Sequence, residues 1–130
     1  MRTLVEDVMT TNTVAVSANT AVRTIAELLA ARSVSAVPVV DLENRVVGVV
    51  SEADVLQHRF TGGTAARIMS SPPLTVRADQ PAAVAAQIIE KYGIKRLPVV
   101  DDMGRLVGIV SRSDLVHAFA FGDDLTVSET

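Results

Sequence analysis

The sequence contains no cysteine and no tryptophan, and only four of its 130 residues are aromatic. The absence of cysteine excludes disulfide bonds and thiol catalysis. Four aromatic side chains are too few for a platform on which nucleic-acid bases stack. The 12 basic and 15 acidic residues give a net charge of -3, and no basic run stands out. We therefore expect no nucleic acid as the main partner.

Long apolar runs are also missing, since none approaches the ~20 residues of a membrane-spanning helix. Glu6 and Asp7 stand where a secretion signal would need apolar residues. We expect a cytoplasmic protein without a membrane partner. Apolar residues nevertheless make up 48% of the chain, mostly Val, Ala, Leu and Ile. This composition is sufficient for a core, and its many β-branched residues favour a sheet.

The chain does have an internal repeat, because residues 8–56 and 68–116 align without a gap at an offset of sixty residues. The Pro-Val-Val-Asp segments at 38–41 and 98–101 fall in step. A repeat that occurs only twice argues against a solenoid, which needs at least three copies. Units of roughly 60 residues are marginal alone. We therefore expect two halves that fold together about a pseudo-twofold axis.

Each copy predicts a short helical lead followed by the order β-α-β-β-α. The fold class is therefore predicted as α+β (α/β-like), with two β-α-β-β-α units packed through their sheets. Side chains near Asn19 or Thr20 and at Asp79 are expected to cap the longer helices. The predicted hairpin strands are 36–40 with 46–50 and 97–100 with 106–110, and the final helices begin at Ser51 and Ser111.

The expected domain division follows the repeat. Residues 1–61 form the first unit and 62–121 form the second, with a short glycine linker at 62–63. Residues 122–130 are acidic and polar, which predicts a flexible tail.

The segments 48–54 and 108–114 share one pattern: glycine, two apolar residues, serine, two variable residues and aspartate. We call this pattern the signature. A helix start offers unpaired N–H groups to a phosphate, the serine adds a donor, and the aspartate accepts from ribose hydroxyls. The glycine would let a ligand approach the backbone. The alternative is a plain capping box, because Ser-x-x-Asp at a helix start also caps the helix.

With both copies in register, the chain resembles the cystathionine-β-synthase (CBS) domain family, from about residue 3 to residue 121. The resemblance implies a tandem, stand-alone module with two clefts that bind adenosine-containing ligands. It implies that Asp54 and Asp114 contact ribose and that Ser51 and Ser111 lie near phosphate or ribose. The residues expected around the base are Thr13, Val14, Val37, Pro73, Leu74 and Leu97.

The two copies differ in charge beside the signature. In the family, basic residues before the Leu-Pro-Val strand often face phosphates, and the second copy has Lys95 and Arg96 there. Arg112 follows Ser111 at the helix start. The first copy has Ser35, Ala36 and Glu52 at the matching positions. We expect the second cleft to suit an anion better. The alternative is that these cations are surface charges in contact with solvent.

Two functions remain open. The first is a regulatory sensor whose effector is an adenine nucleotide or other adenosyl ligand, with no required cofactor. The second is a ligand-free assembly or protein-interaction module. We expect no enzyme, because no nucleophile–base pair is visible, and no metal site, because two histidines alone cannot build one. A homodimer and an unidentified regulated protein are the expected partners.

Overall fold

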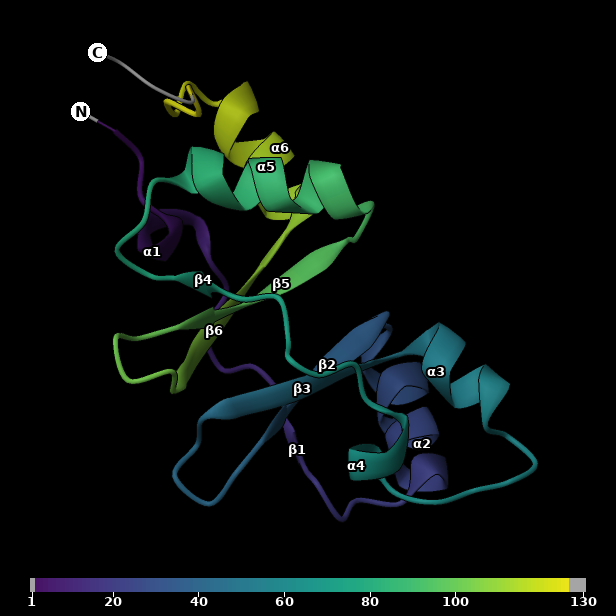
Figure 1. The fold of residues 1–130 in the computed structure, drawn as a ribbon. Helices are drawn as coiled ribbons and strands as arrows, with labels where there is room; N and C mark the ends of the chain where they lie inside the picture. The colour runs from purple at the N-terminus through teal and green to yellow at the C-terminus, as the bar shows by residue number, and fades with distance from the viewer. Residues whose placement is uncertain (1, 127–130) are drawn as a thin grey trace. The chain divides into compact units, whose positions relative to one another are not determined.

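The computed structural model describes residues 2–126, and these fall into two compact units (Figure 1). Unit 2 is the continuous segment Val14–Pro73. Unit 1 combines the residues up to Thr13 with those from Leu74 onward. The chain therefore passes between the units twice, at residues 13–14 and 73–74.

Each unit contains one three-stranded sheet in which the first strand pairs parallel with the second and the second pairs antiparallel with the third. This mixed architecture confirms the α+β prediction, and both hairpins form where the sequence places them. Unit 2 contains β1 (Val16–Ser17), α2 (Val22–Arg32), β2 (Ala36–Val40), β3 (Val46–Ser51), α3 (Glu52–Gln57) and α4 (Ala65–Ile68). Unit 1 contains α1 (Val5–Val8), β4 (Val76–Arg77), α5 (Ala82–Tyr92), β5 (Arg96–Val100), β6 (Leu106–Ser111) and α6 (Arg112–Ala120).

Each unit has its own apolar core. The longer helix of each unit packs on the sheet through one apolar face, as an amphipathic helix does. In unit 2 this face includes Ile25, which is fully buried. In unit 1 it includes Ala85 and Ile89. Burial of an isoleucine side chain such as Ile25 or Ile89 stabilises the fold by roughly 1.5–3 kcal/mol.

The two helical leads pack on units formed mainly by the other repeat. Val5 of α1 is fully buried in the core of unit 1, where its N–H donates to the Gln80 carbonyl at 2.8 Å. Ala65 of α4 is buried in unit 2, and its N–H donates to the Thr20 carbonyl at 2.8 Å. The compact units consequently differ from the expected division into residues 1–61 and 62–121.

This exchange also accounts for helix starts that differ from the prediction. The N-cap residues of α2 and α5 are Ala21 and Pro81, neither with a side-chain cap. Instead, the Val22 N–H donates to the Gly63 carbonyl at 3.1 Å, and the Ala82 N–H donates to the Thr3 carbonyl at 2.8 Å. The lead segments thus satisfy helix N–H groups that would otherwise need a side chain.

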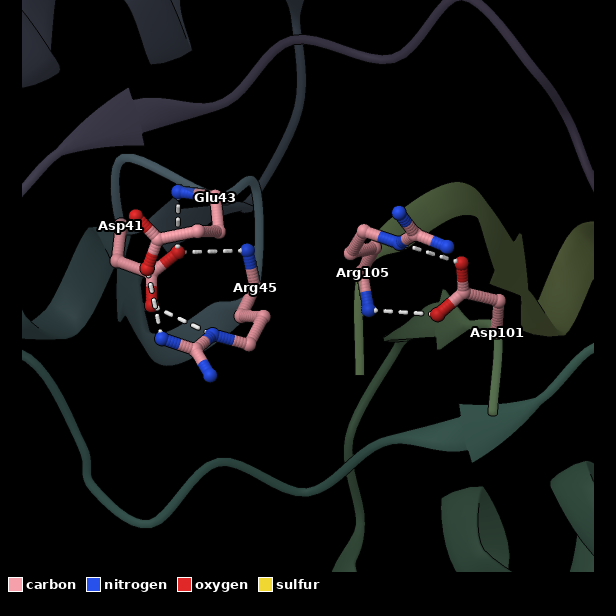
Figure 2. A network of polar contacts seen from close by, with 5 residues as sticks. All are labelled: Asp41, Glu43, Arg45, Asp101 and Arg105. Carbon is pink, nitrogen blue, oxygen red and sulfur yellow. Dashed lines mark hydrogen bonds and ion pairs between the residues drawn. The ribbon is translucent and has the colours of Figure 1, made fainter. Parts of the chain in front are cut away.

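An aspartate organises each hairpin turn (Figure 2). Asp101 Oδ1 accepts from the Arg105 backbone N–H at 2.9 Å, and the Arg105 Nε donates to Asp101 Oδ2 at 2.9 Å. Asp41 makes the same two contacts with Arg45, at 2.8 Å and 3.0 Å. The bond from the arginine backbone N–H is the main reason that the pKa of each aspartate lies below its ordinary value.

The described part of the expected flexible tail, residues 122–126, makes specific contacts in unit 1. The Thr3 hydroxyl donates to Asp123 Oδ1 at 3.3 Å and accepts from the Asp124 N–H at 3.1 Å. Leu125 packs against the core of unit 1. The Thr3 side chain therefore holds the end of the described chain in unit 1. The remaining tail residues, 127–130, lie outside the described residues.

Candidate functional site

The first signature lies where β3 passes into α3 of unit 2. Ser51 is the N-cap of α3, and its hydroxyl oxygen accepts from the Asp54 N–H at 3.2 Å. Asp54 Oδ2 accepts from the Ser51 N–H at 2.8 Å and from the Ser51 hydroxyl at 3.0 Å. The capping box considered from the sequence is therefore present.

The second signature repeats this geometry between β6 and α6 of unit 1. Asp114 Oδ2 accepts from the Ser111 N–H at 2.9 Å, and the Ser111 hydroxyl oxygen accepts from the Asp114 N–H at 3.0 Å. One difference separates the copies. Within residues 2–126, the Ser111 hydroxyl has no acceptor for its own proton, whereas the Ser51 hydroxyl donates to Asp54. Ser111 is also the more buried serine, at 9% exposed.

The backbones of three cationic residues lie next to the second signature. The Arg112 N–H donates to the Lys95 carbonyl at 3.0 Å, which holds these residues together. Arg96 lies directly opposite Ser111 in the β5–β6 pairing. In the described part of the chain, none of the three cationic side chains forms an ion pair.

The same positions in unit 2 carry no cation. The Glu52 N–H donates to the Ser35 carbonyl at 2.9 Å, and Ala36 lies opposite Ser51. The backbone arrangement is thus conserved between the units while the side-chain charge is reversed. The charge difference expected from the sequence therefore lies at equivalent backbone positions of the two units.

The residues expected around a base fall into two groups. Val37 and Leu97 are 2% and 0% exposed and belong to the cores of their own units. The other four stand at the two passages of the chain between the units: Thr13, Val14, Pro73 and Leu74. The clefts that the resemblance implies take residues from both halves, and that arrangement stays a prediction.

The signature glycines have a different use from the one expected. A Cβ at Gly108 would lie 2.7 Å from Met9 Sδ, and a Cβ at Gly48 would collide with Met69. The missing side chain therefore makes room for a methionine of the lead segment, not for a ligand approaching from that side. Both methionines are partly buried and pack against the cores of their units.

The comparisons with known proteins agree with this geometry. The CBS domain family matches residues 5–60 and 65–121. This chain belongs to the CBS domain family. Among solved structures, CBSX2 in complex with AMP is 34% identical, covers 91% of this chain and 96% of its own, and has a TM-score of 0.85. The CBS domain pair of protein MJ0100, in complex with 5′-methylthioadenosine and S-adenosyl-L-methionine, is 29% identical, with 93% and 98% covered and a TM-score of 0.83.

Curated relatives of this CBS pair include much longer proteins. L-aspartate semialdehyde sulfurtransferase of Methanocaldococcus jannaschii is 30% identical over 90% of this chain. A homoserine O-acetyltransferase of Methanosphaerula palustris is 32% identical over 87% of this chain. The chain spans only 23% of the length of each. Their enzyme names therefore describe proteins of which a CBS pair is one part.

Sequence reasoning missed an apolar groove on unit 1 of the CBS pair. It has a volume of about 460 Å³ and lies along α5 and α6, with Leu125 among its lining residues. Glu90 and Arg112 also line it. The available signal was the final helix, in which Leu115 is buried while Val116 and Phe119 are 66% and 70% exposed. A helix that is apolar on more than one face has surface left for another contact.

Residues 2–126 contain no cluster of three or more His, Cys, Asp or Glu arranged as metal ligands would be. They also contain no helix that is long and apolar enough to cross a membrane.

Proposed function

We propose that this CBS pair is a regulatory sensor that binds an adenosine-containing ligand of the AMP, ADP or ATP type. It signals by changing conformation or assembly. The observation that carries the proposal is the signature itself, which occurs twice with the same strand-to-helix geometry. In the described residues, each signature aspartate uses Oδ2 for its own helix and leaves Oδ1 without a partner.

The free oxygen supplies the chemistry needed to hold a nucleoside. A carboxylate oxygen is a strong acceptor for a ribose hydroxyl, because charge-assisted hydrogen bonds are roughly twice as strong as neutral ones. Asp54 and Asp114 would therefore cap a helix through one oxygen and bind ribose through the other. A ligand bound in this way acts directly on the start of α3 or α6, which provides a route from binding to conformation.

The passages of the chain between the units would contribute the remaining contacts. Backbone groups at Thr13–Val14 and Pro73–Leu74 would enclose the base, together with the strands that contain Val37 and Leu97. The structures of CBSX2 with AMP and of the MJ0100 pair with two adenosyl compounds support this ligand class.

Ligand-dependent stability tests the proposal. A ligand that binds only the folded protein at ~100 times its dissociation constant adds about 2.7 kcal/mol of stability. In a chain of this size, thermal unfolding should then rise by several degrees. The probes are AMP, ADP, ATP, 5′-methylthioadenosine and S-adenosylmethionine at millimolar concentration, with guanosine monophosphate as the control. No shift with any adenosyl compound would overturn the sensor function.

The second candidate is a ligand-free assembly module, favoured by the groove along α5 and α6 and by exposed Val116 and Phe119. We propose a homodimer under either function. Light scattering at micromolar concentration should give twice the mass of one chain, and a single-chain mass would contradict it. Neither function assigns a catalytic role or a required cofactor to the chain.

A further inference from the structure

We propose that the two signatures select adenosyl ligands by the charge of their 5′ substituent. The signature of unit 1, Ser111 with Asp114, takes a ligand with a 5′-phosphate. The signature of unit 2, Ser51 with Asp54, takes an adenosyl thioether or sulfonium compound without phosphate. This inference rests on the proposed function and deepens it, since it assigns a different ligand class to each site.

The first support is the reversal of charge around two equivalent serines. Backbone contacts hold Lys95 beside Arg112 and place Arg96 opposite Ser111. Such a cluster favours a phosphate dianion through charge-assisted hydrogen bonds. Asp114 and the groove residue Glu90 are the acidic groups on the neighbouring parts of α6 and α5. They leave a cationic excess at the signature of unit 1.

The signature of unit 2 has the opposite character. Glu52 stands where unit 1 has Arg112, with Ser35 and Ala36 in place of the other two cations. Glu52 gives this helix start a second carboxylate beside Asp54, whereas the helix start of unit 1 has only Asp114, and the additional negative charge repels a phosphate. The same carboxylates attract a sulfonium or ammonium group and tolerate a neutral thioether. An adenosyl compound without phosphate is therefore the matching ligand.

The serine hydroxyls provide an independent difference. The Ser51 proton is already donated to Asp54 Oδ2 at 3.0 Å. The Ser111 hydroxyl, in contrast, has no acceptor for its proton within residues 2–126, although it accepts from the Asp114 N–H. A hydroxyl with a free proton adds a donor for a phosphate oxygen. Only the signature of unit 1 thus offers both cations and a free hydroxyl donor.

The first experiment separates the two sites by disabling one at a time. Asp54→Asn leaves the signature of unit 1 intact, and Asp114→Asn leaves that of unit 2 intact. Calorimetric titrations with AMP and 5′-methylthioadenosine then measure each remaining site. We expect Asp54→Asn to bind AMP at least tenfold more tightly than 5′-methylthioadenosine, because charge-assisted contacts are worth about one to two decades in affinity. Asp114→Asn should instead bind 5′-methylthioadenosine more tightly than AMP.

The second experiment exchanges the selective residues between the repeats. In the Asp54→Asn background, Lys95→Ser, Arg96→Ala and Arg112→Glu should abolish the preference for AMP. In the Asp114→Asn background, Ser35→Lys, Ala36→Arg and Glu52→Arg should create one. Because each new residue already occupies the equivalent backbone position in the other unit, both exchanges should keep the fold. Circular dichroism and thermal unfolding check this.

Lys91→Glu is the matched control, since it changes the net charge as Arg112→Glu does but lies on the exposed last turn of α5. It should shift the ratio of the two affinities less than twofold. Equal preferences in both single-site backgrounds, or a preference unaffected by the exchange, would overturn the selectivity while leaving the sensor function intact. If the unaltered protein binds no adenosyl compound, the proposed function fails as well.

Discussion

Met9 occupies the space that a side chain at residue 108 would need. A Cβ on Gly108 would lie 2.7 Å from Met9 Sδ and 2.9 Å from the Thr10 carbonyl oxygen. That carbonyl also accepts from the Ile109 N–H at 2.9 Å, so the backbone of the lead segment is fixed against β6. In unit 2, the three atoms nearest to a Cβ on Gly48 all belong to the side chain of Met69.

This difference predicts unequal costs for the same substitution. Gly108→Ala should lower the free energy of unfolding by about 1–3 kcal/mol, the usual range for overpacking, because a backbone oxygen cannot move as a methionine does. Gly48→Ala should cost less. Adding Met69→Ala should recover much of the loss at Gly48, whereas adding Met9→Ala should leave Gly108→Ala destabilised. Denaturant unfolding of the four variants measures this, and equal losses at the two glycines would contradict it.

The exchanged leads predict which unit each lead stabilises. Val5→Ala removes a fully buried side chain from unit 1 and should cost about 1–3 kcal/mol. Its effect should appear in the hydrogen exchange of β5 and β6, not in that of β2 and β3. Ile68→Ala should cost about 2–5 kcal/mol and show the reverse pattern. Faster exchange of β2 and β3 in Val5→Ala would mean that α1 stabilises its own repeat.

The signature aspartates predict a separation of binding from folding. Asp114→Asn retains an oxygen that accepts from the Ser111 N–H, so the helix cap and most of the stability should survive. Affinity for AMP should fall by about ten- to a hundredfold, because a neutral amide serves ribose hydroxyls poorly. Asp114→Ala should lose the cap as well, at about 0.5–2 kcal/mol. Thermal unfolding and calorimetric titration of both variants test this, and full affinity in Asp114→Asn would exclude the ribose contact.

The hairpin aspartates predict a sensitivity to acid. The pKa of Asp41 and that of Asp101 lie below the ordinary value, chiefly because each carboxylate accepts from an arginine backbone N–H. A lowered folded-state pKa adds stability above the unfolded pKa, and this stability is lost as pH falls through the folded pKa. Unfolding midpoints should therefore decrease from neutral pH toward pH values below about 4.

Asp41→Asn with Asp101→Asn should flatten this decrease, since neither position can then titrate. Asp102→Asn is the matched control, because in the described chain its exposed carboxylate takes no part in the turn network. An unchanged pH profile in the double variant would show that other groups dominate the acid response.

Local features were predictable from the sequence because local rules determine them. The Pro-Val-Val strands and the hairpins that they begin depend on neighbouring residues. The signature was recognisable for the same reason, since Ser-x-x-Asp encodes both a cap and a binding pattern.

The partners of the leads could not be predicted in this way. Val5 and Ala65 are apolar in a helical pattern, and two units of the same fold offer each of them the same kind of surface. The helical spacing of apolar residues shows that Val5 and Ala65 are buried, but it does not show which unit buries them. The missed caps follow from this, because Asn19 and Asp79 were assigned to helix starts whose N–H groups are instead satisfied by Gly63 and Thr3.

The exchange of α1 and α4 makes the topology an insertion rather than two domains in tandem. Unit 2 is one uninterrupted stretch, Val14–Pro73, placed within a unit 1 whose two segments meet through Thr3 and Asp124. Cutting the chain at the repeat boundary near residue 61 would leave both fragments with a missing core helix. Excision at 13–14 and 73–74 would instead yield a complete unit 2. Unit 2 is therefore a circular permutation of the sequence repeat, with its lead helix at the end, whereas unit 1 keeps the order of the repeat but takes its lead helix from the other copy.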